Sequence, residues 1–184
     1  AQLWMREEDG RPFMGDPRRA LAAVVDRFKA AGLTPVVATE LEFYIVDPSE
    51  AVPQPPCSPV TGKRLDSDGA LSLDELQHFD AFLNEVYDAC AAHGIPADAA
   101  MFKRLVRGIA RKHGFAATFM AKPYGDRAGS GMHVHFSLND AEGRNIFDNG
   151  GEEGTEILRH AVAGLLRTLQ ESALVFAPHE NSVR

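Results

Sequence analysis

The chain has 184 residues, 45% of them apolar and 24% charged, which is the composition of an ordinary globular domain able to bury a core. Its formal net charge of −7 argues against a nucleic-acid or anionic-membrane surface, since such surfaces need clustered Lys and Arg. The only two cysteines, Cys57 and Cys90, exclude a disulfide framework, so we expect a cytoplasmic protein.

The start of the chain and the length of its apolar runs indicate whether it is part of a longer polypeptide and whether it enters a membrane. The chain begins at Ala1 without an initiator methionine, which suggests a piece of a longer polypeptide. No secretory segment opens it, and no run approaches the roughly 18 apolar residues of a membrane span. We therefore expect neither nucleic acid nor a membrane among its partners.

Helices and strands alternate in the first part of the chain. A helix is predicted over 17–31, with Asp16 as its N-cap, and a strand over 34–46. Five prolines over 47–69 predict a long loop. A capping box at Ser72 begins a helix that runs to 93, and another helix is predicted from about 101 to 113.

The second part of the chain reads as a hairpin followed by a helix. Strands over 115–121 and 132–138, joined by a glycine-rich connection, predict a long hairpin. A last helix is expected over 155–177. No domain boundary is evident, and the fold class is α+β, with an antiparallel sheet backed by helices.

The strand over 34–46 has one apolar and one acidic face. Leu41, Phe43 and Ile45 point one way, while Glu40, Glu42 and Tyr44 point the other, because strand side chains alternate. An isolated E-x-E pair is more often solvated than functional. Two such carboxylates lie about 7 Å apart along a strand, a separation that suits two neighbouring ions.

The strand over 132–138 has the same construction with imidazoles. His133, His135 and Ser137 share one face, and the alternate apolar residues, which we expect in the core, are Met132, Val134, Phe136 and Leu138. Glycines at 129 and 131 would let a substrate approach backbone N–H groups closely. Carboxylates combined with imidazole favour Mg²⁺ or Mn²⁺, and paired ions of this kind serve phosphoryl transfer from ATP.

Two motifs in these strands resemble those of the glutamine synthetase family. The segment T-E-L-E-F-Y at 39–44 is similar to its E-x-E-F strand. The segment K-P at 122–123, followed by G-S-G-M-H-V-H at 129–135, is similar to its long K-P and G-S-G-M-H-x-H signature. The resemblance spans about 16–181 and implies a curved antiparallel sheet backed by helices.

The resemblance also implies roles for individual residues. Glu40 and His133 would bind one divalent ion and Glu42 another, so that two or more Mg²⁺ or Mn²⁺ ions are held. The expected ATP contacts are His135, Phe136 and Ser137, and the expected glutamate contacts are Ala128 and Gly129. No residue is assigned as a general base. The implied enzyme is an ATP-dependent ligase that joins ammonia or a polyamine to glutamate through γ-glutamyl phosphate, in a dodecamer of two rings.

The chain departs from the family pattern in three respects. Ala128 stands where an asparagine is usual in glutamine synthetases proper, whereas the branch that uses polyamines such as putrescine often has alanine. The family's G-Q-x-E strand is missing near 100–101. The N-terminal small domain and the C-terminal part of the family are not covered, so 1–184 is expected to be a partial catalytic domain.

Two other functions fit parts of the pattern. A non-catalytic protein of the same fold would explain the missing G-Q-x-E strand, although Glu40, Glu42, His133 and His135 are retained. An iron-dependent oxygenase could use an H-x-H strand, but its site requires two histidines and one carboxylate around one ion. Phosphate release that needs ATP, glutamate and an amine together would separate the ligase from both.

Overall fold

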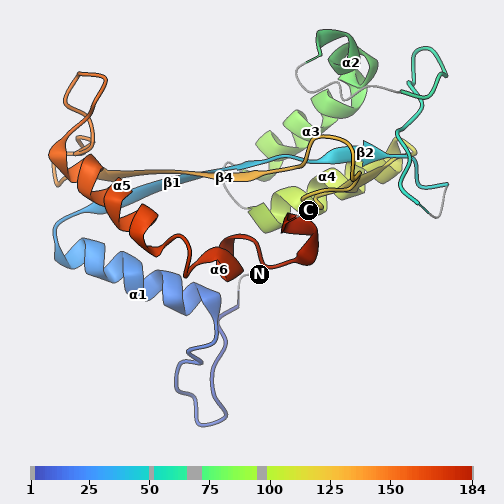
Figure 1. The fold of residues 1–184 in the computed structure, drawn as a ribbon. Coiled ribbons are helices and arrows are strands. Elements are labelled where there is room, and N and C mark those ends of the chain that lie inside the picture. The colour runs from blue at the N-terminus through green and yellow to red at the C-terminus, as the bar shows by residue number, and fades with distance from the viewer. Residues whose placement is uncertain (1–2, 50–51, 66–71, 95–98, 184) are drawn as a thin grey trace. The chain divides into compact units, whose positions relative to one another are not determined.

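The computed structural model describes residues 3–49, 52–65, 72–94 and 99–183. Their elements, most of them labelled in Figure 1, follow the order α1 (Pro17–Ala30), β1 (Thr34–Leu41), β2 (Tyr44–Val46), α2 (Leu73–His78), α3 (Asp80–His93), α4 (Ala99–Lys112), β3 (Ala116–Thr118), β4 (Met132–Asn139), α5 (Glu156–Thr168), α6 (Ala173–Phe176) and the 3₁₀ helix η1 (Glu180–Val183). Among the described residues, no helix has both the length and the apolar character that crossing a bilayer requires.

The chain divides into two compact units. One consists of 1–38 and 135–171, and the other of 39–134 and 172–184. The first unit contains α1 and α5, and the second contains α2, α3, α4, β2, β3 and α6. The strands β1 and β4 each contribute residues to both units.

The predicted helix boundaries hold where capping residues are present. Asp16 accepts a hydrogen bond from the backbone N–H of Arg18 at the start of α1, and Pro17 occupies the first turn, as predicted. Ser72 accepts from the N–H of Glu75 at the start of α2. Gly94 ends α3 in the left-handed conformation, at φ 57°, which glycine adopts without steric cost.

The strand pairing differs from the prediction. The strand expected over 34–46 is interrupted at Glu42 and Phe43, so that β1 and β2 belong to different two-stranded sheets. The predicted hairpin of the strands before and after the glycine-rich connection is wrong: β4 pairs with β1, and β3 pairs antiparallel with β2, with Tyr44 opposite Thr118. The α+β class is confirmed.

Two predicted long helices are each broken. The helix expected over 72–93 is divided between α2 and α3 at Phe79, whose backbone leaves the helical region (φ −109°, ψ 15°) while its side chain is buried. The helix expected over 155–177 ends at Thr168 and is followed by the short α6. The apolar pattern continues through both breaks, which is why periodicity alone does not reveal them.

The core of the second unit lies between α3, α4 and β3. Its buried side chains are Phe79, Phe82, Val86, Val106, Ile109, Ala110 and Ala117. Outside this cluster, the salt bridges from Glu85 of α3 to Lys112 (2.6 Å) and His113 (2.8 Å) tie α3 to the C-terminal end of α4. Those two contacts lower the pKa of the Glu85 carboxyl group, chiefly through the hydrogen bond from Lys112.

Apolar faces outside this core are largely exposed, which contradicts the expectation for β4. Met132, Val134 and Phe136 are 58%, 55% and 43% exposed, and only Leu138 of the predicted core face is buried. The apolar stripes of α1 and α5 contain no buried residue. The expectation failed because periodicity identifies an apolar face but not what covers it.

Candidate metal and substrate site

All three predicted metal ligands lie together in the second unit. Glu40, Glu42 and His133 each offer a ligand atom, and the three atoms lie within 4.8 Å of one another. The His133 Nδ1 to Glu40 Oε1 distance is 3.7 Å, and both side chains are more than half exposed. Two carboxylates and one imidazole form a donor set that fits Mg²⁺ or Mn²⁺.

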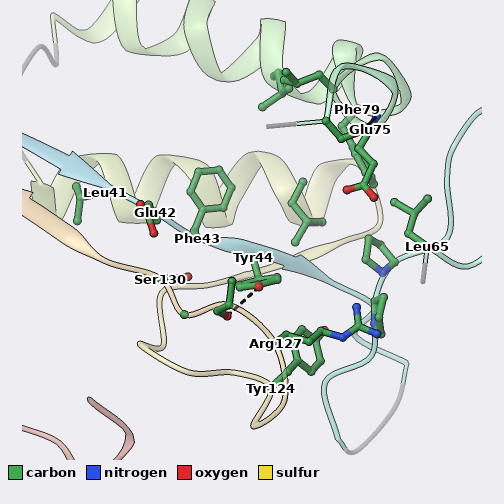
Figure 2. Close-up of a pocket in the computed structure, with 18 of the residues that line it drawn as sticks. Leu41, Glu42, Phe43, Tyr44, Leu65, Glu75, Phe79, Tyr124, Arg127 and Ser130 are labelled. Carbon is green, nitrogen blue, oxygen red and sulfur yellow. Dashed lines mark hydrogen bonds between the residues drawn. The ribbon is translucent and has the colours of Figure 1, made fainter. Parts of the chain in front are cut away.

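Glu42 is positioned by the residue that follows it. The Phe43 ring packs against Phe82, Phe102 and Phe119, with ring centroids 6.5, 6.3 and 5.3 Å away. This aromatic group anchors the break between β1 and β2 to the core. Because Phe43 points toward the helices, the adjacent Glu42 side chain points the other way (Figure 2).

The glycine-rich connection over 122–131, hereafter the glycine loop, is bound to Glu42 at its end. The Glu42 N–H donates to the Gly131 carbonyl oxygen at 3.1 Å. In return, the Gly131 N–H donates to Glu42 Oε2 at 2.8 Å. One carboxylate oxygen of this candidate ligand therefore has a fixed partner in the loop.

The glycines of this loop serve contacts within the protein. The Ser130 N–H donates to the Ala121 carbonyl oxygen at 2.7 Å, and the Gly131 N–H is taken by Glu42. A Cβ on Gly129 would lie 2.6 Å from that same Ala121 oxygen. The expectation that these N–H groups receive a substrate is thus wrong for residues 130 and 131, whose hydrogen bonds are already made.

A cavity of about 540 Å³ lies beside two of the three candidate ligands, Glu40 and Glu42, in the same unit (Figure 2). Glu40 and Glu42 line one part of it, together with Ala128, Gly129 and Ser130 of the glycine loop. The remaining walls come from β2, α2, α3, the loop after β2 and the glycine loop, including Phe43, Tyr44, Leu65, Glu75, Phe79, Tyr124 and Arg127. The structure thus brings two of the predicted metal ligands, Glu40 and Glu42, and the predicted glutamate contacts to one cavity.

Two tyrosines and an arginine form one wall of the cavity. The rings of Tyr44 and Tyr124 meet edge to face at 5.4 Å, and the Arg127 guanidinium lies 5.3 Å from the Tyr124 ring centroid. Burial raises the pKa of the Tyr124 hydroxyl, and this oxygen has no hydrogen-bond partner among the described residues. A buried polar atom without a partner is typical of a place where water or a ligand binds.

The residues predicted to contact ATP lie further along β4, in the first unit. His135 and Ser137 occupy the strand positions that alternate with the apolar set. The Phe136 ring contacts Phe28 and Phe147, with centroids 6.0 and 6.1 Å away, so it packs among apolar rings. Their expected role toward ATP stays a prediction.

The sequence reading missed two residues that bond the glycine loop. The Tyr44 hydroxyl donates to the Ala128 carbonyl oxygen at 2.9 Å (Figure 2). Asn181 bonds both the N–H and the carbonyl of Lys122, each at 2.8 Å. In the predicted strand Tyr44 lies on the same side as Glu40 and Glu42, and that alternation was a usable signal; nothing in the sequence marks Asn181.

The family model described as the glutamine synthetase catalytic domain matches residues 14–101 and 97–184. The chain therefore belongs to the glutamine synthetase family, as its motifs indicated. The two matched ranges overlap at 97–101, so the chain follows the family model in two parts that meet there.

Named relatives cover nearly all of this chain. It is 37% identical over 212 aligned positions to γ-glutamylputrescine synthetase of Escherichia coli (strain K12), covering 99% of this chain and 45% of that protein. It is 32% identical to γ-glutamylethanolamide synthetase of Streptomyces coelicolor, covering 96% and 44%. A solved complex of GmaS with ADP has a TM-score of 0.81 at 26% identity, covering 96% and 46%. The chain thus spans about half the length of the relatives it matches.

Proposed function

We propose that the protein is an ATP-dependent carbon–nitrogen ligase that joins ammonia or a polyamine such as putrescine to the γ-carboxylate of glutamate. A γ-carboxylate oxygen attacks the terminal phosphorus of ATP, which forms γ-glutamyl phosphate and releases ADP. The amine nitrogen then attacks the acyl carbon, phosphate leaves, and the nitrogen loses a proton. The product is a γ-glutamyl amide.

One observation carries this proposal: Glu40 and Glu42, two of the three clustered ligands, line the same cavity as Ala128 and Gly129. The reaction requires divalent ions and a carboxylate substrate side by side, and this is the arrangement that the cavity offers. When bound, Mg²⁺ or Mn²⁺ ions would neutralise the phosphate charge that accumulates during transfer. Glu40, Glu42 and His133 would hold them.

The remaining roles follow the family pattern residue by residue. Ala128 and Gly129 would contact glutamate, and His135, Phe136 and Ser137 would contact ATP. No general base is assigned, because positioning and charge neutralisation supply most of the rate enhancement in phosphoryl transfer. The chain's own contribution would be to orient the two substrates and exclude water.

The amine acceptor is proposed from two observations. Ala128 replaces the asparagine usual in glutamine synthetases proper. One relative at 37% identity and one of those at 32% are named for putrescine and ethanolamide products, while further relatives are named glutamine synthetases. We therefore favour an organic amine over ammonia, with putrescine as the first candidate.

The proposed setting of the chain is a larger assembly. We propose that 1–184 forms part of a catalytic domain and that a segment near 100–101 is missing. The meeting of the two matched ranges at 97–101 supports the second statement, as does an alignment longer than the chain itself. A cytoplasmic homo-oligomer, a dodecamer of two rings, is proposed from the family resemblance.

Phosphate release is the direct test. The purified protein, incubated with ATP, glutamate and Mg²⁺ or Mn²⁺, should release phosphate only when an amine is added. A panel of ammonia, putrescine, spermidine and ethanolamine would identify the acceptor, and mass spectrometry of the amide would verify the product. Phosphate release that is independent of glutamate would refute the proposal.

A second candidate is a non-catalytic protein of the same family. The observation in its favour is the junction at 97–101 between the two matched ranges, which supports the absence of the family's G-Q-x-E strand. Such a protein would bind Mn²⁺ at Glu40, Glu42 and His133 without turnover. Binding in calorimetry together with absent phosphate release across the amine panel would identify it.

A further inference from the structure

The glycine loop, residues 122–131, contains no helix or strand. Hydrogen bonds to side chains nevertheless hold it at three separate points. At its base, Asn181 of η1 accepts from the Lys122 N–H through Oδ1 and donates to the Lys122 carbonyl through Nδ2, both at 2.8 Å. The side-chain amide of Asn181 thus satisfies both the backbone N–H and the backbone carbonyl of Lys122. Such paired bonds fix orientation as well as distance.

The middle of the loop is held by Tyr44. Its hydroxyl donates to the Ala128 carbonyl oxygen at 2.9 Å, and its ring packs edge to face against Tyr124, at 5.4 Å between centroids. Tyr124 in turn lies beneath the Arg127 guanidinium. Tyr44 therefore contacts the loop on both sides of Asp126, and Figure 2 shows its hydroxyl directed at the loop.

The end of the loop is tied to a candidate metal ligand. The reciprocal bonds between Gly131 and Glu42, at 3.1 and 2.8 Å, join the loop backbone to the carboxylate. The loop therefore has three attachments: Asn181 at its base, Tyr44 at Ala128 and Glu42 at its end. Two of these attachments come from Glu42 and Tyr44, which lie two residues apart at the break between β1 and β2.

We propose that Tyr44 and Asn181 are positioning residues that hold the glycine loop in the place where Ala128 and Gly129 meet the acid substrate. The inference rests on the proposed function. It assigns the two side chains to the glutamate half of the reaction, because the atoms they bond belong to the loop. The residues proposed to contact ATP lie on β4, outside the loop.

The test uses Tyr44→Phe and Asn181→Ala, singly and together. Tyr44→Phe keeps the ring and removes only the hydroxyl, and loss of one such bond should raise KM for glutamate about fivefold to tenfold. Asn181→Ala loses two bonds and should raise it further. KM for ATP should stay within about twofold, which a general loss of structure would not produce.

The double variant tests whether Tyr44 and Asn181 act together through the glycine loop or independently of each other. If both side chains act through the loop, the combined effect on KM for glutamate should fall short of the product of the single effects. Tyr87→Phe and Asn84→Ala, at exposed positions of α3, are the matched controls and should behave as wild type. Equal rises in KM for both substrates in Tyr44→Phe would overturn the proposal.

Hydrogen–deuterium exchange supplies a readout that needs no turnover. Peptides covering 122–131 should exchange faster in Tyr44→Phe, while peptides from α3 and α4 stay unchanged. Unaltered exchange in the loop would overturn the proposal even if activity fell. Absent phosphate release from the wild-type protein would instead refute the proposed function, and the positioning role with it, so the two failures are distinguishable.

Discussion

The helix pair α3 and α4 and the strand β4 have apolar faces of similar quality, but only the helix pair buries its face. Val106 is 0% exposed, whereas Val134 is 55% exposed. Phe82 is 1% exposed, whereas Phe136 is 43% exposed. The described residues of this chain therefore complete one core and leave a second apolar surface largely uncovered.

This difference shows that apolar periodicity identifies the apolar face of a helix or strand but not the residues that bury it. The core of α3, α4 and β3 is local, since its members lie within 79–117. The strand β4 belongs to a family fold of which this chain spans about half the length. An exposed apolar face of this kind is typical of a surface that packs against another part of a protein.

The largest expected difference between the two regions follows from placing an aspartate in each of them. Val106→Asp should prevent folding or cost about 4 kcal/mol or more of unfolding free energy, because the carboxylate has no partner in the core. Met132→Asp should cost less than about 1 kcal/mol, since its side chain is 58% exposed. Urea denaturation followed by circular dichroism would measure both, and equal losses would contradict the contrast.

The ligand cluster should behave as a functional surface with little structural role. Glu40→Ala and His133→Ala should each lower metal-dependent phosphate release on the order of 100-fold or more, because charge on the transferring phosphate loses its stabilisation. The unfolding midpoint should hardly change, since both side chains are more than half exposed. Calorimetry with Mn²⁺ should show weakened binding. A Glu40→Ala enzyme of normal activity would disprove the ligand assignment.

The glycine loop should tolerate added side chains at one glycine and not at another. Gly129→Ala places a Cβ 2.6 Å from the Ala121 backbone oxygen, so we expect a displaced loop, a cost of about 1–3 kcal/mol and a higher KM for glutamate. Gly125→Ala is the control, because no atom lies within 4 Å of its added Cβ. Similar kinetics for the two variants would mean that the close approach at residue 129 has no consequence.

The smallest expected effect concerns the charge contacts of Glu85. Its pKa is lowered, first by the hydrogen bond from Lys112, so its ionised form stabilises the folded state at pH values above the ordinary 4.5. That contribution is lost as the pH falls through the lowered folded-state pKa. Glu85→Gln should therefore reduce the melting temperature at pH 7, and the difference from wild type should vanish under acidic conditions. Asp88→Asn, on the same helix, is the control.

Local features were predictable from the sequence. Asp16 and Ser72 are side-chain caps whose bonds reach two or three residues along the chain, so their sequence signatures suffice. Strand alternation predicted the acidic and imidazole faces, and the family resemblance selected Glu40, Glu42 and His133 from them as candidate ligands. The predicted separation along the strand did not reveal that their ligand atoms approach within 4.8 Å.

The features that failed depend on distant partners. The break after Leu41 reflects the anchoring of Phe43 by Phe82, Phe102 and Phe119, residues far along the chain. The pairing of β2 with β3 replaced the nearer hairpin for the same reason, since sequence proximity does not determine strand pairing. Asn181 acts on Lys122 across 59 positions, and no local pattern could have indicated this contact.

If Glu42 binds an ion as proposed, the bond that its carboxylate accepts from Gly131 would affect ion selectivity. One carboxylate oxygen already accepts the Gly131 N–H, so coordination through a single oxygen is the less costly mode for this side chain. Ca²⁺ commonly takes both oxygens of a carboxylate, whereas Mg²⁺ prefers six single-oxygen contacts in an octahedron. The loop amide would thus bias the site toward the smaller cation.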